Sequence, residues 1–313
     1  MLKERIYILG AGAIGLSLAT YLVNNGKEVT AIRTSTDAVD SKQVEIAITG
    51  VDGRICTASI EMVSLAKLRG LDGVIVVTAK SYANDLIATR LKGLVTSSPL
   101  VIMQNGVGIE NPYLNLDTAR IYRCVLYSIS QKDKNNSYKF VSITASPIGI
   151  VRGNEQELDY LVNELNTTAF PFVLHGDIKR EVWKKAIINA VFNSICPLLE
   201  IDNGIFVRDE KASLLAQEIV DECLVIAHNI GIRLSVEEIM QQIFAISKKS
   251  EGQLISTLQD INAGRETEID YLNLEIARLG ETLIPVIKAS TTKTLGEMIK
   301  MKSKLHKKSI LAG

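Results

Sequence analysis

A lysine and two asparagines recur at four-residue intervals inside an otherwise apolar stretch of this 313-residue chain. They are Lys185, Asn189 and Asn193, in the segment WKKAIINAVFNSICP. Side chains four residues apart lie one above another on the same face of a helix. Burying an amine and two amides without partners would be costly. This polar file therefore predicts either a structural hydrogen-bond network or one wall of a binding site for a small polar substrate.

A second polar stretch supplies a hydroxyl and a carboxylate. It is STLQDINAGRETEIDY, with Ser256 at its start and Glu268 near its end. A carboxylate close to a lysine favours the protonated amine, which is the form that an acid catalyst needs. The two stretches together predict a small polar substrate and a proton donor, for which Lys185 is the candidate.

A glycine pattern of the G-x-G-x-x-G type lies near the N-terminus. The segment GAGAIG supplies Gly10, Gly12 and Gly15. Residues 5–9 before it are a short apolar run typical of a buried strand, and residues 13–25 after it have the spacing of an amphipathic helix. In this context the pattern predicts dinucleotide binding, and the alternative is a tight strand–helix turn without a ligand.

Each position of this turn has a physical role. The first glycine permits the tight turn, the second lets a pyrophosphate approach the backbone, and the third lets helix and strand pack closely. The N-terminus of the helix faces the phosphates with free N–H groups. The predicted cofactor-binding residues of the turn are Gly10, Gly12, Ala13, Ile14 and Gly15.

The residues after the second predicted strand, at 28–32, bear on the identity of the cofactor. An acidic residue there would bind the ribose hydroxyl of NAD. The chain instead continues RTSTD, in which Arg33 offers a cation with forked donors and Thr34 and Ser35 offer hydroxyls. This sequence favours NADP(H). The alternative is that Arg33 is an ordinary exposed arginine and that Asp37 binds the ribose of NAD.

Strand and helix patterns alternate through the first half of the chain, which predicts a parallel sheet covered on both faces. The further predicted elements are strands at 73–79, 99–103 and 170–174, a helix at 82–94, a hairpin within 44–63 and strand-like texture from 119 to 151. From residue 178 to about residue 301 the periodicity is helical. The expected fold class is α/β. A Rossmann-type NADP-binding domain spans residues 1–176, and an all-helical substrate and catalytic domain spans residues 177–313.

Composition and charge exclude several other classes of protein. Lys and Arg number 35, as do Asp and Glu, so no excess of basic charge indicates nucleic acid or an anionic membrane as a partner. No uninterrupted apolar run reaches the ~18 residues of a membrane span. The four scattered cysteines are typical of a reducing cytoplasm. Neither they nor the three separated histidines have the spacing of a metal site.

Five motifs resemble the ketopantoate reductase (2-dehydropantoate 2-reductase) family in order and near its spacing. They are GAGAIG, TAKSY, QNGVG, WKKAIINAVFNSICPLLEIDNG and STLQDINAGRETEIDY, and they cover essentially the whole chain. The last two motifs are far more specific than the glycine pattern. The resemblance implies NADPH-dependent reduction of 2-dehydropantoate to pantoate, a step toward pantothenate and coenzyme A.

The resemblance also implies roles for single residues. Lys185 matches the family's proton donor, and Glu268 matches its glutamate. The residues that match the family's substrate-binding positions are Asn189, Asn193, Asn203 and Ser256, and those that match its cofactor positions after the glycine turn are Arg33, Lys80 and Asn105. Two departures stand out. Arg33 lies about one residue early, and Gln253 occupies a position where the family has asparagine.

Three functions stay open from the sequence. The first is reduction of 2-dehydropantoate, and the second is reduction of another 2-oxo acid or ketone, which Gln253 keeps open. The third is a nucleotide-sensing protein without turnover, against which the retained Lys185 and Glu268 argue, because a sensor needs no acid catalyst. A homodimer is compatible with the sequence, which does not reveal the oligomeric state.

Overall fold

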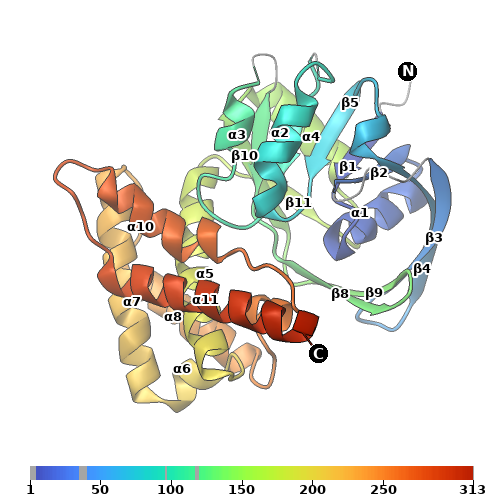
Figure 1. Ribbon diagram of the computed structural model, residues 1–313. Helices are drawn as coiled ribbons and strands as arrows, with labels where there is room; N and C mark the ends of the chain where they lie inside the picture. Colours follow the sequence, from blue (N-terminus) through green and yellow to red (C-terminus); the bar gives the residue numbers. More distant parts are fainter. Residues whose placement is uncertain (1–4, 35–40, 96, 117–119, 313) are drawn as a thin grey trace. The chain divides into compact units, whose positions relative to one another are not determined.

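The computed structural model describes residues 5–34, 41–95, 97–116 and 120–312 (Figure 1). The chain divides into two compact units. The first consists of Met1–Gln104 and Ile109–Ile178, and we call it the N-terminal unit. The second consists of Asn105–Gly108 and Lys179–Gly313, and we call it the helical unit. A four-residue segment from the first half of the chain thus belongs with the helices of the second half.

A mixed sheet forms the N-terminal unit. Within the described residues it has eleven strands in the order β11-β10-β7-β6-β5-β1-β2-β4-β3-β9-β8. The strands are β1 (Arg5–Leu9), β2 (Val29–Arg33), β3 (Lys42–Thr49), β4 (Ile55–Ser64), β5 (Gly73–Val77), β6 (Leu100–Ile102), β7 (Ile121–Cys124), β8 (Ser128–Lys134), β9 (Ser137–Ser142), β10 (Ser146–Arg152) and β11 (Phe172–Leu174). The central strands β7, β6, β5, β1, β2 and β4 run parallel to one another. The predicted parallel sheet and the predicted hairpin, which is the antiparallel pair β3–β4, are both confirmed.

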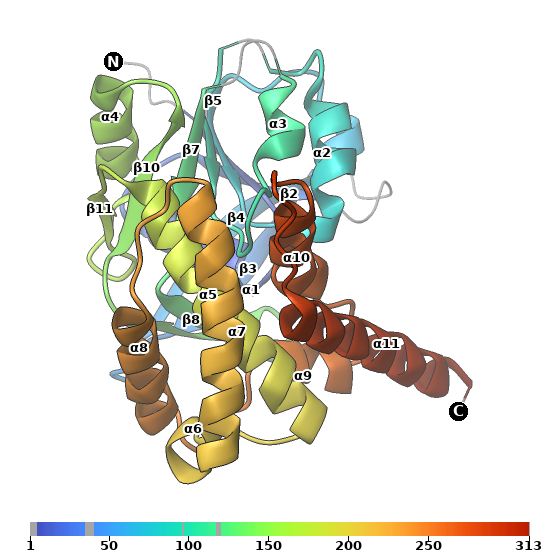
Figure 2. The ribbon, with the colours of Figure 1, turned by 90° about the vertical axis from the view of Figure 1, so that its left-hand side faces the viewer.

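Helices cover this sheet on both faces. They are α1 (Ala13–Asn24), α2 (Asn84–Leu91), α3 (Asn111–Leu114) and α4 (Glu155–Leu165), with short 3-10 helices η1 (Leu65–Lys67) and η2 (Ser81–Ala83). Figure 2 shows α4 on one side of the strands and α2 and α3 on the other. The sequence patterns predict no element for residues 152–169, so α4 is a finding of the structure. Its N-cap is Asn154, whose side chain accepts a hydrogen bond from the backbone N–H of Glu157.

The core of the N-terminal unit follows from strand alternation. Ile6 and Ile8 of β1 and Val74 and Val76 of β5 are fully buried and pack in one cluster with the apolar sides of α1 and α4. Their immediate neighbours along each strand point to the opposite face. Strand β5 is buried on both faces and is apolar throughout, and β1 is apolar after the exposed Arg5, as the sequence predicts for buried parallel strands.

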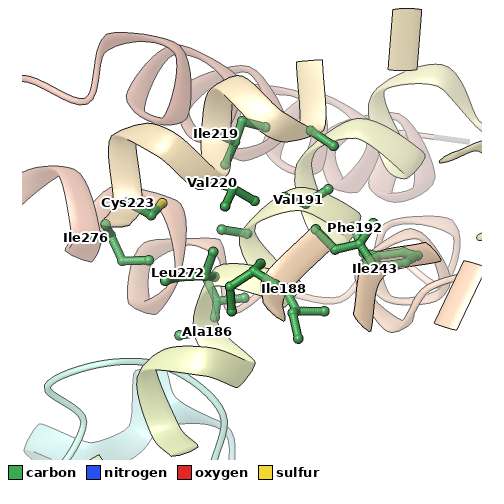
Figure 3. Close-up of a cluster of buried hydrophobic side chains, with 14 of the residues drawn as sticks. Ala186, Ile188, Val191, Phe192, Ile219, Val220, Cys223, Ile243, Leu272 and Ile276 are labelled. Atoms are coloured by element: carbon green, nitrogen blue, oxygen red, sulfur yellow. The ribbon is translucent and has the colours of Figure 1, made fainter. Parts of the chain in front are cut away.

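The helical unit is built around the 22-residue helix α5 (Ile178–Leu199). The other elements are α6 (Ile205–Arg208), α7 (Glu210–Asn229), α8 (Val236–Lys249), α9 (Ser256–Asn262), η3 (Ile269–Tyr271), α10 (Asn273–Glu281) and α11 (Ser290–Ala312). Figure 3 shows Ile188, Val191 and Phe192 of α5 packed with residues of α7, α8 and α10. Each such fully buried side chain contributes about 1.5–3 kcal/mol of transfer free energy. None of the described helices is long and apolar enough to cross a membrane.

Helix α5 continues through Pro197 to Leu199 instead of breaking at the proline. Proline has no N–H, so the helical hydrogen bond to the carbonyl four residues earlier, that of Asn193, is missing. From α11, the ammonium of Lys302 donates to the carbonyl of Pro197 at 2.7 Å and to the carboxylate of Glu200 at 2.8 Å. The end of α5 is therefore fixed by α11.

Candidate cofactor and catalytic sites

The carboxyl ends of β1, β2 and β5 meet at one edge of the sheet. The backbone N–H of Gly10 donates to the carbonyl of Ile32 at 2.9 Å, which joins the turn after β1 to the end of β2. The N–H groups of Thr78 and Ala79 donate to the carbonyl of Leu9 at 2.8 and 2.9 Å, which joins β5 to the same turn. This edge, at neighbouring parallel strands, is where doubly wound sheets bind ligands.

The three glycines of the turn have different surroundings. Gly10 has φ of +122°, and a Cβ there would overlap the backbone of Ala79. A Cβ on Gly15 would overlap the carbonyl of Gly10. A Cβ on Gly12 would meet nothing within 4 Å. The backbone of Gly12 is extended, a conformation that any residue can adopt. The chain's own packing therefore requires the first and third glycines, and the second leaves open space at the turn.

Helix α1 begins at this open space. Gly12 is its N-cap and makes no side-chain capping hydrogen bond, and no acidic residue lies in the first turn. Ala13 and Ile14, the first helical residues, are half-buried. The N–H groups of a first helical turn have no partner within the helix and carry the positive end of its dipole. This helix end is therefore suited to an anion such as a phosphate.

Arg33 ends β2 beside the glycine turn and is half-buried. Its Nε is buried and has no hydrogen-bond partner among the described residues. Burial raises the pKa of Tyr138 on β9, and the positive charge of Arg33 lowers it, so the guanidinium lies within electrostatic range of that ring. Of the other residues considered for this position, Thr34 is half-buried, and Ser35 and Asp37 lie outside the described residues.

The two remaining predicted cofactor residues follow β5 and β6. Lys80 is half-buried and is the N-cap of η2, next to Ala79, which contacts the glycine turn. Asn105 is half-buried and begins the segment that belongs to the helical unit. The structure thus places the glycine turn, Arg33 and Lys80 together in the N-terminal unit, whereas Asn105 is counted with the helical unit.

In the helical unit, the predicted polar file lies along the middle of α5. Lys185 and Asn189 are half-buried, and Asn193 is only 4% exposed. The side-chain oxygen of Asn193 has no hydrogen-bond partner among the described residues. A buried polar group without a partner is costly, so this amide is suited to a bound polar molecule.

Lys184, the neighbour of Lys185, has a structural partner. Its ammonium lies 3.0 Å from Glu238 of α8. The same carboxylate forms an ion pair with Arg180, whose Nε also donates to the carbonyl of Arg233. Burial acts to raise the pKa of Glu238, but Lys184 and Arg180 together bring it below its usual value. Lys184 therefore ties α5 to α8.

Asn203 is brought next to the segment that carries Ser256. Its backbone N–H donates to the carbonyl of Gln253 at 2.9 Å, and its carbonyl accepts from the Ser247 hydroxyl at 2.7 Å. Asn203 is 7% exposed, and its side-chain oxygen has no partner among the described residues. Ser256 is exposed at the first position of α9. The two predicted substrate segments are thus neighbours, with Gln253 directly beside Asn203.

Glu268 is half-buried and is the N-cap of η3. The backbone N–H of Val107 donates to the carbonyl of Tyr271 at 2.9 Å, and Val107 is packed in the core of the helical unit. The segment that begins with Asn105 therefore lies beside the η3 segment that carries Glu268.

The sequence motifs did not include Asn273, which lies two residues after the motif that ends at Tyr271. Asn273 is fully buried, and its Nδ2 donates to the carbonyl of Ala190 in the middle of α5 at 3.1 Å. It thereby fixes the helix between Asn189 and Asn193. The sequence offered one indication of it, an asparagine at the first position of the helix that follows the motif. Across the residues that the structure describes, no three His, Cys, Asp or Glu side chains are grouped in a way that could hold a metal ion.

A Rossmann-type sheet with an open glycine turn at its carboxyl edge is typical of dinucleotide-binding proteins, among them the pyridine-nucleotide-dependent oxidoreductases. Two family models identify the oxidoreductase family. Residues 6–152 match "Ketopantoate reductase PanE/ApbA", and residues 177–303 match its C-terminal model. The chain therefore belongs to the ketopantoate reductase family.

Relatives and solved structures agree over nearly the full chain. The 2-dehydropantoate 2-reductase of Pyrococcus horikoshii is 28% identical over 281 residues, which are 88% of this chain and 91% of that protein. The Shigella flexneri enzyme of the same name is 25% identical, with 86% of each chain covered. A D-mandelate dehydrogenase, solved with NADH and anilino(oxo)acetate, has a TM-score of 0.83 at 20% identity, covering 96% of this chain and 99% of that one. A dimeric ketopantoate reductase from Staphylococcus aureus has a TM-score of 0.79 at 17% identity with the same coverage. The structural likenesses establish the fold.

Proposed function

We propose that this protein reduces 2-dehydropantoate to pantoate with NADPH, in the biosynthesis of pantothenate and coenzyme A. The observation that carries the proposal is the pair of buried amides, Asn193 and Asn203, whose oxygens have no partner among the described residues. A hydroxyl on the substrate would give such an oxygen the hydrogen bond it lacks. 2-Dehydropantoate carries a hydroxyl in addition to its keto and carboxylate groups, and relatives across bacteria and archaea bear the name of this reaction.

The glycine turn and Arg33 fit NADPH. The open space at Gly12 and the uncapped start of α1 suit a pyrophosphate. The partnerless Nε of Arg33 at the end of β2 suits a further phosphate on the ribose. Lys80 adds a positive charge at the same edge of the sheet. These residues would hold the cofactor, and when bound NADPH supplies the hydride.

The chain's own contribution to the chemistry is proton transfer and orientation. As hydride reaches the keto carbon, the carbonyl oxygen becomes an alkoxide that must take up a proton. Lys185 is the group that we assign to donate it, because an ammonium both stabilises the developing negative charge and gives up a proton, whereas an amide only orients. We assign Glu268 to hold either the Lys185 ammonium or the substrate hydroxyl, and Asn189, Asn193, Asn203 and Ser256 to bind the substrate's polar groups.

The experiment is a decrease in NADPH absorbance when 2-dehydropantoate is added to the purified protein. The matched control is 2-oxoisovalerate, which has the same 2-oxo acid group but lacks the hydroxymethyl group. A site built to bind a hydroxyl rejects an analogue without it by on the order of 10⁴-fold in kcat/KM. Equal use of both compounds would reject the assignment of the amides, and no turnover of either would reject the proposed reaction.

A second candidate is the reduction of another 2-oxo acid. Two observations favour it. Gln253 is one methylene longer than the asparagine that the family resemblance leads us to expect, and it lies directly beside Asn203. The D-mandelate dehydrogenase of the same fold was solved with an aryl-substituted 2-oxo acid derivative. Phenylglyoxylate in the same assay tests this candidate, which requires its kcat/KM to exceed that of 2-dehydropantoate.

The oligomeric state is a separate point. The S. aureus ketopantoate reductase is described as dimeric. We propose the same for this chain, acting in the cytoplasm. Light scattering coupled to gel filtration tests it, since the monomer has a mass of 34.3 kDa and a homodimer has twice that mass.

A further inference from the structure

The segment Asn105–Gly108 has an irregular backbone that is rich in glycine. It lies in no helix or strand, and two of its four residues are glycines with positive φ, +113° at Gly106 and +68° at Gly108. Glycine loses more conformational entropy on ordering than any other residue. Val107 in the middle of the segment is held by the hydrogen bond from its N–H to the carbonyl of Tyr271, and the position of Asn105 depends in addition on what fixes the two ends of the segment.

One buried side chain fixes both ends. Asn84, the first residue of α2, is 1% exposed. Its Oδ1 accepts from Nε2 of Gln104, the residue before the segment, at 2.7 Å. Its Nδ2 donates to the carbonyl of Ile109, the residue after the segment, at 3.0 Å. Asn84 thus spans the base of the Asn105–Gly108 loop.

Neighbouring groups hold Asn84 and Gln104 in this arrangement. The hydroxyl of Tyr113, a fully buried residue of α3, donates to Oδ1 of Asn84 at 2.9 Å, and α2 and α3 lie side by side (Figures 1 and 2). Nε2 of Gln104 also donates to the carbonyl of Ala79 at 2.6 Å, directly before Lys80. These bonds fix the Asn84 amide orientation, because Oδ1 faces two donors and Nδ2 faces an acceptor.

A buried arginine supports the same loop from the sheet. Arg123 on β7 is 2% exposed, and its Nη1 donates to the carbonyl of Gln104 at 3.2 Å. Its Nε lies 3.7 Å from the carboxylate of Glu110, which follows Ile109. Burial lowers the pKa of Arg123, and Glu110 opposes that effect. A buried charge with partners on both sides of the loop is a second clamp across its base.

We infer that Asn84 is a positioning residue for the cofactor site, which sets the place of Asn105 by holding both ends of the Asn105–Gly108 segment. This inference rests on the proposed NADPH-dependent function, in which Asn105 touches the cofactor. Asn84 itself touches none of the reacting groups. Such supporting residues hold a binding group in its productive geometry, and their loss acts through the group they hold.

The first measurement is amide hydrogen exchange in the cofactor-free protein. Asn84→Ala should raise the exchange rate of residues 105–108 about tenfold, because both ends of the segment lose their hydrogen bonds to Asn84 and keep only the Arg123 contacts. Tyr113→Phe removes a single hydrogen bond to Asn84 and should raise it about threefold. Ser98→Ala is the control. Its buried hydroxyl bridges Leu71 and Gly73 at the amino end of β5, so exchange in 105–108 should not change.

The second measurement is a double-mutant cycle on the Kd of NADPH, followed by cofactor fluorescence. Asn84→Ala should weaken binding about tenfold in the natural chain but less than about twofold in an Asn105→Ala background. A residue with only a structural role would lower stability and give additive effects on Kd. Additive effects on Kd, or unchanged exchange in 105–108, would each overturn the inference.

The two proposals fail in different ways. Wild-type protein that binds no NADPH would overturn the proposed function and this inference with it, whereas normal binding with an additive cycle would overturn the inference alone. If Asn84→Ala does not fold, Tyr113→Phe carries both measurements with the same sign. In that case an unchanged exchange rate and an unchanged Kd reject the inference.

Discussion

Lys184 and Glu238 form an ion pair of 3.0 Å between α5 and α8, while the adjacent Lys185 belongs to the polar file with Asn189 and Asn193. Successive residues on a helix point about 100° apart. Two neighbouring lysines of the same helix therefore face different directions. Lys184 points to Glu238 and joins α5 to α8, and Lys185 is the lysine that we propose as proton donor.

The pair of lysines gives the sharpest test of the catalytic proposal. Lys185→Ala should lower kcat by about 10²–10⁴-fold, the usual effect of losing a general acid. The Kd of NADPH should barely change, because the cofactor residues that we propose lie mainly in the N-terminal unit. Steady-state kinetics and a fluorescence titration measure the two quantities.

Lys184→Ala is the matched control for that variant. Its kcat should stay near the wild-type value, while the free energy of unfolding falls by about 1 kcal/mol from the loss of a partly buried ion pair. A crippled Lys184→Ala enzyme beside a nearly normal Lys185→Ala enzyme would show that the two roles are exchanged.

The ion pairs of Glu238 with Lys184 and Arg180 predict that the stability of the protein depends on pH. The pKa of Glu238 is lowered in the folded protein, so its contribution is fully present above the unfolded-state value of about 4.3 and is lost as the pH falls through the lower folded-state pKa. Chemical unfolding at pH 7 and at about pH 3.5 should show a smaller loss of stability in Glu238→Gln than in the natural chain. The same loss in both would mean that this carboxylate makes no pH-dependent contribution.

The glycine turn predicts opposite outcomes for two similar substitutions. Gly12→Val should fold, because an added Cβ there meets nothing within 4 Å and the backbone is extended, but it should abolish NADPH binding. Gly15→Val should destabilise the fold itself, because its Cβ would overlap the carbonyl of Gly10. Circular dichroism and NADPH titration distinguish the two, and tight binding by Gly12→Val would show that the turn serves only the fold.

Arg33 predicts the choice of cofactor. Arg33→Ala should weaken NADPH binding by about 1–3 kcal/mol, the value of a charge-assisted contact, and should leave NADH binding nearly unchanged. Titration of the variant with each cofactor measures this. An equal loss for both would remove Arg33 from the phosphate site.

Asn189 and Lys185 should differ in which kinetic constant they affect. Asn189→Ala should mainly raise KM, because an amide that only orients the substrate contributes equally to the ground state and the transition state. Initial rates over a range of substrate concentrations separate the two constants. A fall in kcat at unchanged KM would give Asn189 a part in the chemical step.

The sequence alone determined the features that depend on short-range spacing. The period of three to four residues placed Lys185, Asn189 and Asn193 in one file on a helix, and alternation of strands and helices predicted the parallel sheet, which the structure confirms. The glycine pattern predicted the turn after β1, because local backbone geometry accepts only glycine at Gly10. Each of these conclusions needs only residues that are close together in the chain.

Tertiary structure decided which distant residues are partners. Glu238 forms an ion pair with Lys184, and the carbonyl of Gln253 accepts a hydrogen bond from the N–H of Asn203. Asn84 forms hydrogen bonds to both ends of the loop that begins at Asn105. No local pattern encodes these pairs, because they arise when whole helices and strands pack their apolar faces and bring together polar groups from separate segments. Burial then requires each of those groups to find a hydrogen-bond partner, and the packing of the fold determines which one it meets.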